Sequence, residues 1–219
     1  MNIVGIVAKQ ERKSKMDILA VDIETMPNPE MISRLPEVEA DSRLKDEAKI
    51  KADIEKKKEE QIKKMALNPL YGKIACIGYY GDKIKEVDLR DEKEMIQRLM
   101  DLWNDNLIVT WNGKAFDFEF IIKRGVILGL CPLTALERFT GKYSKYTLHI
   151  DLMEKWCGFG KFAKLNEVAQ VLLNGECKEE FDVEQIPELI KTPTGQELIK
   201  RYCLQDCKLT YDLAKKMGY

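Results

Sequence analysis

Two acidic residues stand two positions apart in an otherwise apolar stretch of the chain. Asp22 and Glu24 lie near the end of residues 17–25, a short β-branched run that predicts a central strand buried on both faces. Side chains two apart on a strand point to the same face, and this strand has no Lys or Arg to pair with the two carboxylates. Hard divalent cations prefer carboxylate oxygen, so the pair indicates a metal site. A strand end facing solvent would also accept both acids and is the structural alternative.

A third acid follows a strand, a turn and the start of a helix. Residues 107–111 predict a short buried strand, Asn112-Gly113 predicts a turn, and Asp117 falls on the first turn of the next helix. This order places the carboxylate above the end of the sheet, where α/β proteins usually bind ligands. The helix dipole also favours an acid near a helix N-terminus, which is the structural alternative.

A fourth acid shares a helix face with a tyrosine. Tyr202 and Asp206 are four residues apart within 193–217, and Thr192 followed by Pro193 is typical of a helix start. Asp206 falls in the middle of this helix, where a carboxylate gains nothing from the helix dipole. A position on the helix surface is the alternative for this side chain.

Taken together, the three segments resemble the motifs of the DEDDy 3′–5′ exonucleases of the ribonuclease H-like superfamily. The motifs are Asp22-x-Glu24, Asn112-x-x-x-Phe116-Asp117 and Tyr202-x-x-x-Asp206. The closer similarity is to the stand-alone group that resembles the proofreading exonuclease domain of family-B DNA polymerases, and it is carried by residues 22–25, 70–77, 111–114, 149–152 and 202–206. The histidine variant of these enzymes has His five residues before the last acid, where this chain has Arg201, so the resemblance implies the tyrosine class.

This resemblance implies a metal-dependent 3′–5′ exonuclease that hydrolyses terminal phosphodiester bonds of single-stranded DNA by a two-metal-ion mechanism. In the family pattern, Asp22, Glu24 and Asp206 hold the ion that activates water. Asp22 also bridges to the second ion, which Asp117 supports through its waters. Two Mg²⁺ ions are expected, with Mn²⁺ as a substitute, because both accept oxygen-only coordination. Tyr202 would orient the attacking water rather than take its proton, because a phenol with a pKa of ~10 stays protonated at neutral pH.

The same resemblance implies substrate contacts beside the carboxylates. The residues expected to touch the terminal nucleotide are Thr25, Asn112, Lys114 and Phe116. Residues 138–146 interleave three basic and three aromatic side chains without an acid, a pattern that suits a single strand and equally an ordinary exposed loop. Two other functions stay open: a 3′–5′ exoribonuclease, whose acids would be identical, and a catalytically silent nucleic-acid-binding module on the same fold.

The elements that would position these residues form an α/β pattern. We expect a ribonuclease H-like mixed central sheet flanked by helices, because strands and helices alternate without a strict βαβ order. Besides the strand at 17–25, the patterns predict a hairpin over 73–80 and 84–89, strands over 107–111 and 147–153, and helices over 91–103, 115–128, 165–173 and 193–217.

A long charged segment separates the first strand from the hairpin. Residues 43–65 hold nine basic and six acidic side chains without Gly or Pro, which predicts one long exposed helix, either simply solvated or an arm that touches nucleic acid. We expect residues 1–16 to be an N-terminal extension and 17–219 to be a single exonuclease domain. Within that domain, residues 28–66 are expected to be an inserted charged helical segment.

Composition narrows the remaining possibilities. The 219 residues carry 36 Lys and Arg against 37 Asp and Glu, a formal net charge of −1, which excludes a globally basic coat for duplex DNA. A single histidine, His149, rules out most zinc sites and is expected to be a packed or hydrogen-bonding residue. Cys203 and Cys207 are expected to be buried reduced thiols. Without a long apolar run or a secretory signal, we expect no membrane partner and a soluble, cytoplasmic protein.

Overall fold

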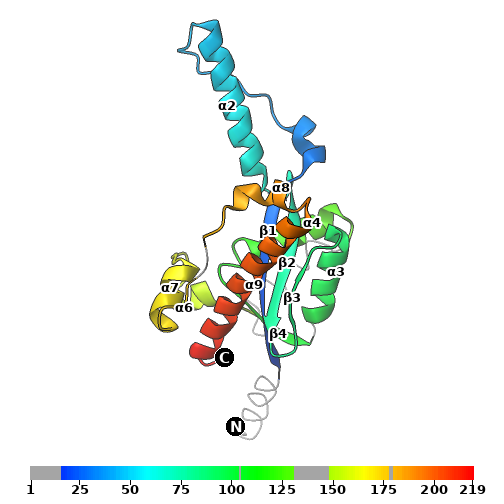
Figure 1. Ribbon diagram of the computed structural model, residues 1–219, viewed down its shortest axis with the longest axis vertical. Helices are drawn as coiled ribbons and strands as arrows, with labels where there is room; N and C mark the ends of the chain where they lie inside the picture. The colour runs from blue at the N-terminus through cyan, green and yellow to red at the C-terminus, as the bar shows by residue number, and fades with distance from the viewer. Residues whose placement is uncertain (1–15, 104, 131–147, 178–179) are drawn as a thin grey trace, which may run out of the picture.

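A five-stranded mixed sheet forms the centre of the molecule (Figure 1). The computed structural model describes residues 16–103, 105–130, 148–177 and 180–219, so the basic and aromatic loop 138–146 lies outside the described residues. The strands are β1 (Asp17–Pro27), β2 (Gly72–Gly81), β3 (Lys85–Asp88), β4 (Asn106–Thr110) and β5 (His149–Asp151). Their order in the sheet is β3-β2-β1-β4-β5. β1 pairs antiparallel with β2 and parallel with β4, and β5 extends the parallel half.

Helices cover both faces of this sheet. The longer helices are α2 (Glu47–Met65), α3 (Glu92–Trp103), α4 (Asp117–Ile127), α7 (Leu165–Leu172) and α9 (Pro193–Lys216), and the shorter ones are η1 (Pro29–Arg34), α6 (Leu152–Cys157), η2 (Val183–Gln185) and α8 (Ile186–Leu189). Leu19, Val21 and Ile23 of β1 face the core formed with α3 and α4. Ile18 and Ala20 face the core formed with α7 and α9. The mixed sheet flanked by helices that the sequence predicts is therefore confirmed.

The last strand is shorter than its sequence pattern indicates. The predicted strand over 147–153 is wrong beyond Asp151, because the Asp151 carboxylate accepts a hydrogen bond from the Glu154 N–H at 3.2 Å and so begins α6. His149 is buried, with Nε2 2.8 Å from the Thr110 Oγ1, which confirms the expected packed position. Within the described ranges, no helix is long and apolar enough to cross a membrane.

The charged segment forms an arm that leaves the body of the protein. Helix α2 projects beyond one end of the sheet (Figure 1), and Met65 at its inner end is the buried residue of this helix. The helix begins at Glu47 rather than at the predicted position 43, because the Asp46 side chain accepts from the Lys49 N–H at 3.0 Å and caps it. Lys63 at the inner end pairs with Glu184 at 2.7 Å, which ties the arm to the segment before α8.

A glycine sets how deeply α9 lies against the sheet. Gly78 of β2 stands opposite Asp22 of β1 in the antiparallel register. A Cβ atom placed on Gly78 would lie 2.6 Å from the sulfur of Cys203 and 2.6 Å from that of Cys207. Both cysteines are free and fully buried, which confirms the expectation of reduced thiols. The missing side chain and two small thiols thus let α9 approach β1 and β2 closely.

We expect Gly78→Ala to destabilise the protein by about 1–3 kcal/mol, the usual cost of an extra methyl group in a packed core. Thermal unfolding measures this loss. The matched test repeats the substitution in a Cys203→Ala/Cys207→Ala background, where both sulfurs that meet the new methyl group are gone. The cost should shrink in that background, and an equal cost in both would contradict the packing explanation.

Candidate active site

The first two acids lie on the face of β1 that α9 covers. Asp22 and Glu24 alternate with Val21 and Ile23, whose side chains point into the opposite core. Asp22 is half-buried, and Glu24 is buried with 8% of its surface exposed. The sequence therefore places both carboxylates on one face as predicted, and that face is turned toward the protein rather than toward open solvent.

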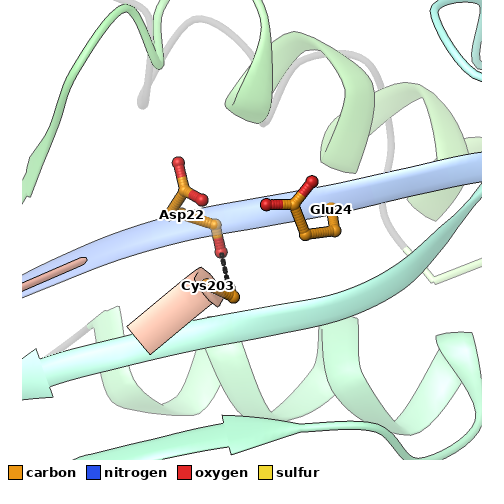
Figure 2. A group of neighbouring side chains, drawn as sticks. All are labelled: Asp22, Glu24 and Cys203. Atoms are coloured by element: carbon orange, nitrogen blue, oxygen red, sulfur yellow. Dashed lines mark hydrogen bonds between the residues drawn. The ribbon is translucent and has the colours of Figure 1, made fainter. Parts of the chain in front are cut away.

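Helix α9 brings a second set of side chains to the same place. The Cys203 thiol donates to the backbone carbonyl oxygen of Asp22 at 3.9 Å. The dashed line in Figure 2 marks this contact. A carboxylate oxygen of Asp22, one of Glu24 and the Cys203 sulfur all lie within 4.8 Å of one another. Asp206, one helical turn further along α9, is buried with 6% exposure.

The start of α4 supplies the fourth acid. Strand β1 continues past the end of β4, and in the described ranges its parallel pairing ends with Ala20 opposite Val109. Asp117 lies at this edge, and its Oδ1 accepts a hydrogen bond from the backbone N–H of Ile23 at 3.2 Å. The carboxylate is buried, with 5% exposure, and is fixed to the strand between Asp22 and Glu24.

The charges of these acids act on one another. Burial and the negative charges of Asp117, Glu24 and Asp206 raise the pKa of Asp22 well above its ordinary value. Burial raises the pKa of Asp117 to about 7, with further increases from the charges of Asp151 and Asp206, although the N–H groups of Asp117 and Ile23 oppose the shift by hydrogen bonding. The structure thus brings Asp22, Glu24, Asp117 and Asp206 together.

Tyr202 lies beside this cluster with its ring fixed by stacking. The ring is 9% exposed and packs on Phe181, with ring centroids 4.5 Å apart and planes at 22°. Phe181 precedes Tyr202 by about twenty residues and belongs to the segment before α8. No spacing rule in the sequence indicates this contact. The stacking limits the rotation of the Tyr202 ring and therefore the positions that its hydroxyl can reach.

Asp151, which fits no position of the acidic motifs, holds the turn between β4 and α4. Its two carboxylate oxygens accept hydrogen bonds from the Asn112 N–H at 3.1 Å and the Lys114 N–H at 3.0 Å. Asn112 has a left-handed backbone with φ of 66°, which asparagine tolerates better than most residues. An acid at the end of the neighbouring parallel strand is the sequence signal for this role, and the acidic motifs do not include it.

The predicted substrate contacts lie in two different surroundings. Lys114 forms an ion pair with Glu154 at 2.5 Å, on the side of the turn that faces α6. Thr25 and Phe116 line a cleft of about 380 Å³ next to Glu24 and the inner end of α2. The Thr25 hydroxyl in this cleft donates to the backbone carbonyl of Ala66 at 2.7 Å.

The donor set is suited to a hard divalent cation. Carboxylate oxygens are the ligands that Mg²⁺ and Mn²⁺ prefer, and a cation would offset both the burial and the neighbouring negative charges that raise the pKa of Asp22. Among the described residues, neither Asp22 nor Asp117 forms an ion pair with a lysine or arginine. Among the described residues, the Cys203 sulfur lies close to carboxylate oxygens of Asp22 and Glu24, and the acidic motifs do not indicate its position beside Asp22.

Comparisons with known proteins show the family of this chain. A family described as "Predicted 3'-5' exonuclease related to the exonuclease domain of PolB" matches residues 74–217. A DNA polymerase of Thermococcus gorgonarius is 28% identical over 141 residues, which is 57% of this chain and 18% of that protein. A DNA polymerase of Pyrococcus horikoshii is 27% identical over 154 residues, which is 60% of this chain and 12% of that protein.

A solved structure has the same fold. The family B DNA polymerase from the hyperthermophilic archaeon Pyrobaculum calidifontis superposes with a TM-score of 0.60 at 18% identity, over 92% of this chain and 24% of that one. The mixed sheet and flanking helices are therefore a ribonuclease H-like exonuclease fold, and the chain spans less than a quarter of these polymerases. With the match over 74–217, the chain belongs to the family of predicted 3′–5′ exonucleases related to the exonuclease domain of PolB.

Proposed function

We propose that the protein is a metal-dependent 3′–5′ exonuclease that removes terminal nucleotides from single-stranded DNA. The observation that carries this proposal is the convergence of four acids from three distant segments, β1, the start of α4 and the middle of α9. Burial, together with the charges of the other three acids, raises the pKa of Asp22 well above its ordinary value. A fold that holds repelling carboxylates together without a visible structural benefit indicates a functional site. The family membership supports the exonuclease reaction over other metal-dependent chemistry.

In this proposal Asp22, Glu24, Asp117 and Asp206 hold two Mg²⁺ ions, for which Mn²⁺ substitutes. Such ions, when bound, lower the pKa of water and neutralise charge on the attacked phosphate. The side chain of Tyr202 positions the attacking water with its hydroxyl and is helped by the stacking on Phe181. The tyrosine itself does not act as the base.

We place the terminal nucleotide in the cleft beside Glu24. Thr25 and Phe116 line this cleft of about 380 Å³, and Phe116 offers an aromatic ring for a base. Asn112 and Lys114 would contact the strand from the turn after β4. We further propose that residues 17–219 act as one domain, with 28–66 as an insertion whose inner end, near Lys63 and Ala66, forms the outer wall of the cleft.

The activity is tested with a 5′-labelled single-stranded DNA and the matching RNA, each with Mg²⁺ or Mn²⁺. We expect a ladder of products that shortens from the 3′ end of the DNA. Removing groups that merely orient metal ligands costs about 10–100-fold, so Asp206→Asn should lower the rate by more than about a hundredfold. Asp212→Asn is the matched control, because Asp212 lies on the same helix but pairs with Lys208 at 2.7 Å.

Cleavage of the RNA in preference to the DNA would replace the proposal with the exoribonuclease alternative. No cleavage of either polymer with either metal would favour a silent binding module. Equal losses in Asp206→Asn and Asp212→Asn would contradict the role assigned to the acidic cluster.

The raised pKa of Asp117 predicts that its carboxylate lowers the stability of the metal-free fold at alkaline pH. Because this pKa is about 7 in the folded protein against an ordinary value of 3.8, Asp117 destabilises the metal-free fold increasingly as the pH rises from about 4 to about 7. The effect is complete above about pH 7 and absent below about pH 4. Asp117→Asn removes the charge but keeps an oxygen that can accept from Ile23. Without metal, the variant should therefore melt at a higher temperature than the wild type at about pH 8, and the difference should shrink on acidification.

Millimolar Mn²⁺ should reverse this order, because an ion that binds only the folded state raises its melting temperature. The wild type should gain more than Asp117→Asn, with Asp105→Asn, an exposed aspartate, behaving as the wild type. An equal gain in all three proteins would place the bound Mn²⁺ outside the acidic cluster.

A further inference from the structure

A second cleft opens on the far side of the turn that follows β4, and two exposed aromatic rings border it. Phe159 and Phe162 leave 75% and 69% of their surfaces exposed. They line a cleft of about 510 Å³ together with Asn112 and Lys114 of the turn. Large apolar side chains gathered at one exposed cleft are typical of a binding surface.

The segment that carries these rings is held in place. The Trp111 indole N–H donates to the carbonyl of Ala163 at 2.9 Å, so the segment is fastened to the end of β4. Gly158 and Gly160 have left-handed backbones, with φ of 84° and 73°, and turn the chain on both sides of Phe159. The rings are therefore presented on a defined backbone that is joined to the same turn as the acidic cluster.

Charge identifies the occupant of this cleft. Residues 155–164 contain three lysines and three aromatic residues but no acid. Two acids also line the cleft: Glu154 pairs with Lys114 at 2.5 Å, and the Asp151 carboxylate accepts hydrogen bonds from the N–H groups of Asn112 and Lys114. In the part of the chain that the structure describes, Lys161 forms no ion pair and so remains available for an anionic ligand. Aromatic rings interleaved with ammonium groups suit unpaired bases joined by phosphates.

The topology connects the cleft with the acidic cluster. β1, β4 and β5 run parallel, so the segments that follow β4 and β5 leave the sheet at the same edge. One of these segments leads to Asp117 and the other to Phe159 and Phe162. A strand whose 3′ end lies at the carboxylates can therefore continue along this edge over the rings.

We propose that the cleft between the Asn112–Lys114 turn and the rings of Phe159 and Phe162 binds unpaired bases of the single-stranded substrate upstream of its 3′ end, with Lys161 at the phosphates. This proposal rests on the exonuclease function proposed above and adds the path of the strand to it. The bases of a duplex are stacked on each other and are not accessible to such rings, so the cleft selects single strands.

Binding is measured by fluorescence anisotropy with labelled oligonucleotides, in an Asp206→Asn background that slows cleavage and without added divalent cation. We expect Phe159→Ala and Phe162→Ala each to weaken single-strand binding by about tenfold, and to leave binding of a blunt duplex unchanged. Val171→Ala is the matched control, because Val171 is also a highly exposed apolar residue, at 77%, but lies on α7 outside the cleft. Lys161→Ala should lower the slope of log Kd against log salt by about 0.7.

A small substrate separates this proposal from the exonuclease function itself. Thymidine 5′-(4-nitrophenyl phosphate) occupies only the terminal position, so the two phenylalanine variants in an otherwise wild-type chain should hydrolyse it at the wild-type rate. If the two variants bind single strands more weakly but the wild type hydrolyses no substrate, the assignment of the cleft stands and the exonuclease proposal is wrong.

Unchanged single-strand affinity in both variants would overturn the assignment of the cleft. The assignment also fails if the variants alter only self-association in light scattering, since the rings would then form a protein interface. Thermal unfolding of each variant checks that the exposed rings were removed without damage to the fold.

Discussion

Mutual repulsion among four carboxylates is the constraint on which this structure depends. Three separate features of the backbone place the four acids. Asp22 and Glu24 are set by the alternation of β1, Asp117 by the N–H of Ile23 at 3.2 Å, and Asp206 by the position of α9. Burial and the charges of neighbouring acids raise the pKa of Asp22 and of Asp117, so the metal-free fold disfavours the ionised form of both groups. The surrounding fold must therefore be stable enough to keep the acids in place before any cation arrives.

The depth of α9 is the second condition for this cluster, and it depends on very small groups. A side chain at position 78 would push α9 away from β1, and Asp206 and Tyr202 would move with it. The sulfur of Cys203 fills the space next to the carbonyl of Asp22 instead. The geometry of the acidic cluster consequently depends on how α9 packs, because the same face of α9 supplies both the core side chains and the acid.

Local patterns in the sequence were enough to predict most of the elements, whereas the four acids were singled out by the resemblance of three segments to the exonuclease motifs. The alternation around Asp22, the strand and turn before Asp117 and the helical spacing of Tyr202 and Asp206 are all short-range signals. The contacts that position these residues join segments far apart in the chain, such as Gly78 with Cys207 or Tyr202 with Phe181, and no local rule describes them. Asp151 shows the same limit, because its role at Asn112 depends on two strands lying side by side.

An acidic cluster cannot attract the phosphates of its own substrate. The residues that bind the nucleic acid must therefore differ from those that would hold the cations. Before cations bind, the four carboxylates repel the phosphates of a nucleic acid, and the net charge of −1 gives no general attraction. Affinity must then come from surfaces that lie apart from the acids and do not rely on charge alone. Exposed rings meet this need, because stacking on a base is favourable with or without bound cations. A strand held by its bases at Phe159 and Phe162 would keep its 3′ end close to the carboxylates, so that the phosphate and the cations complete the site together.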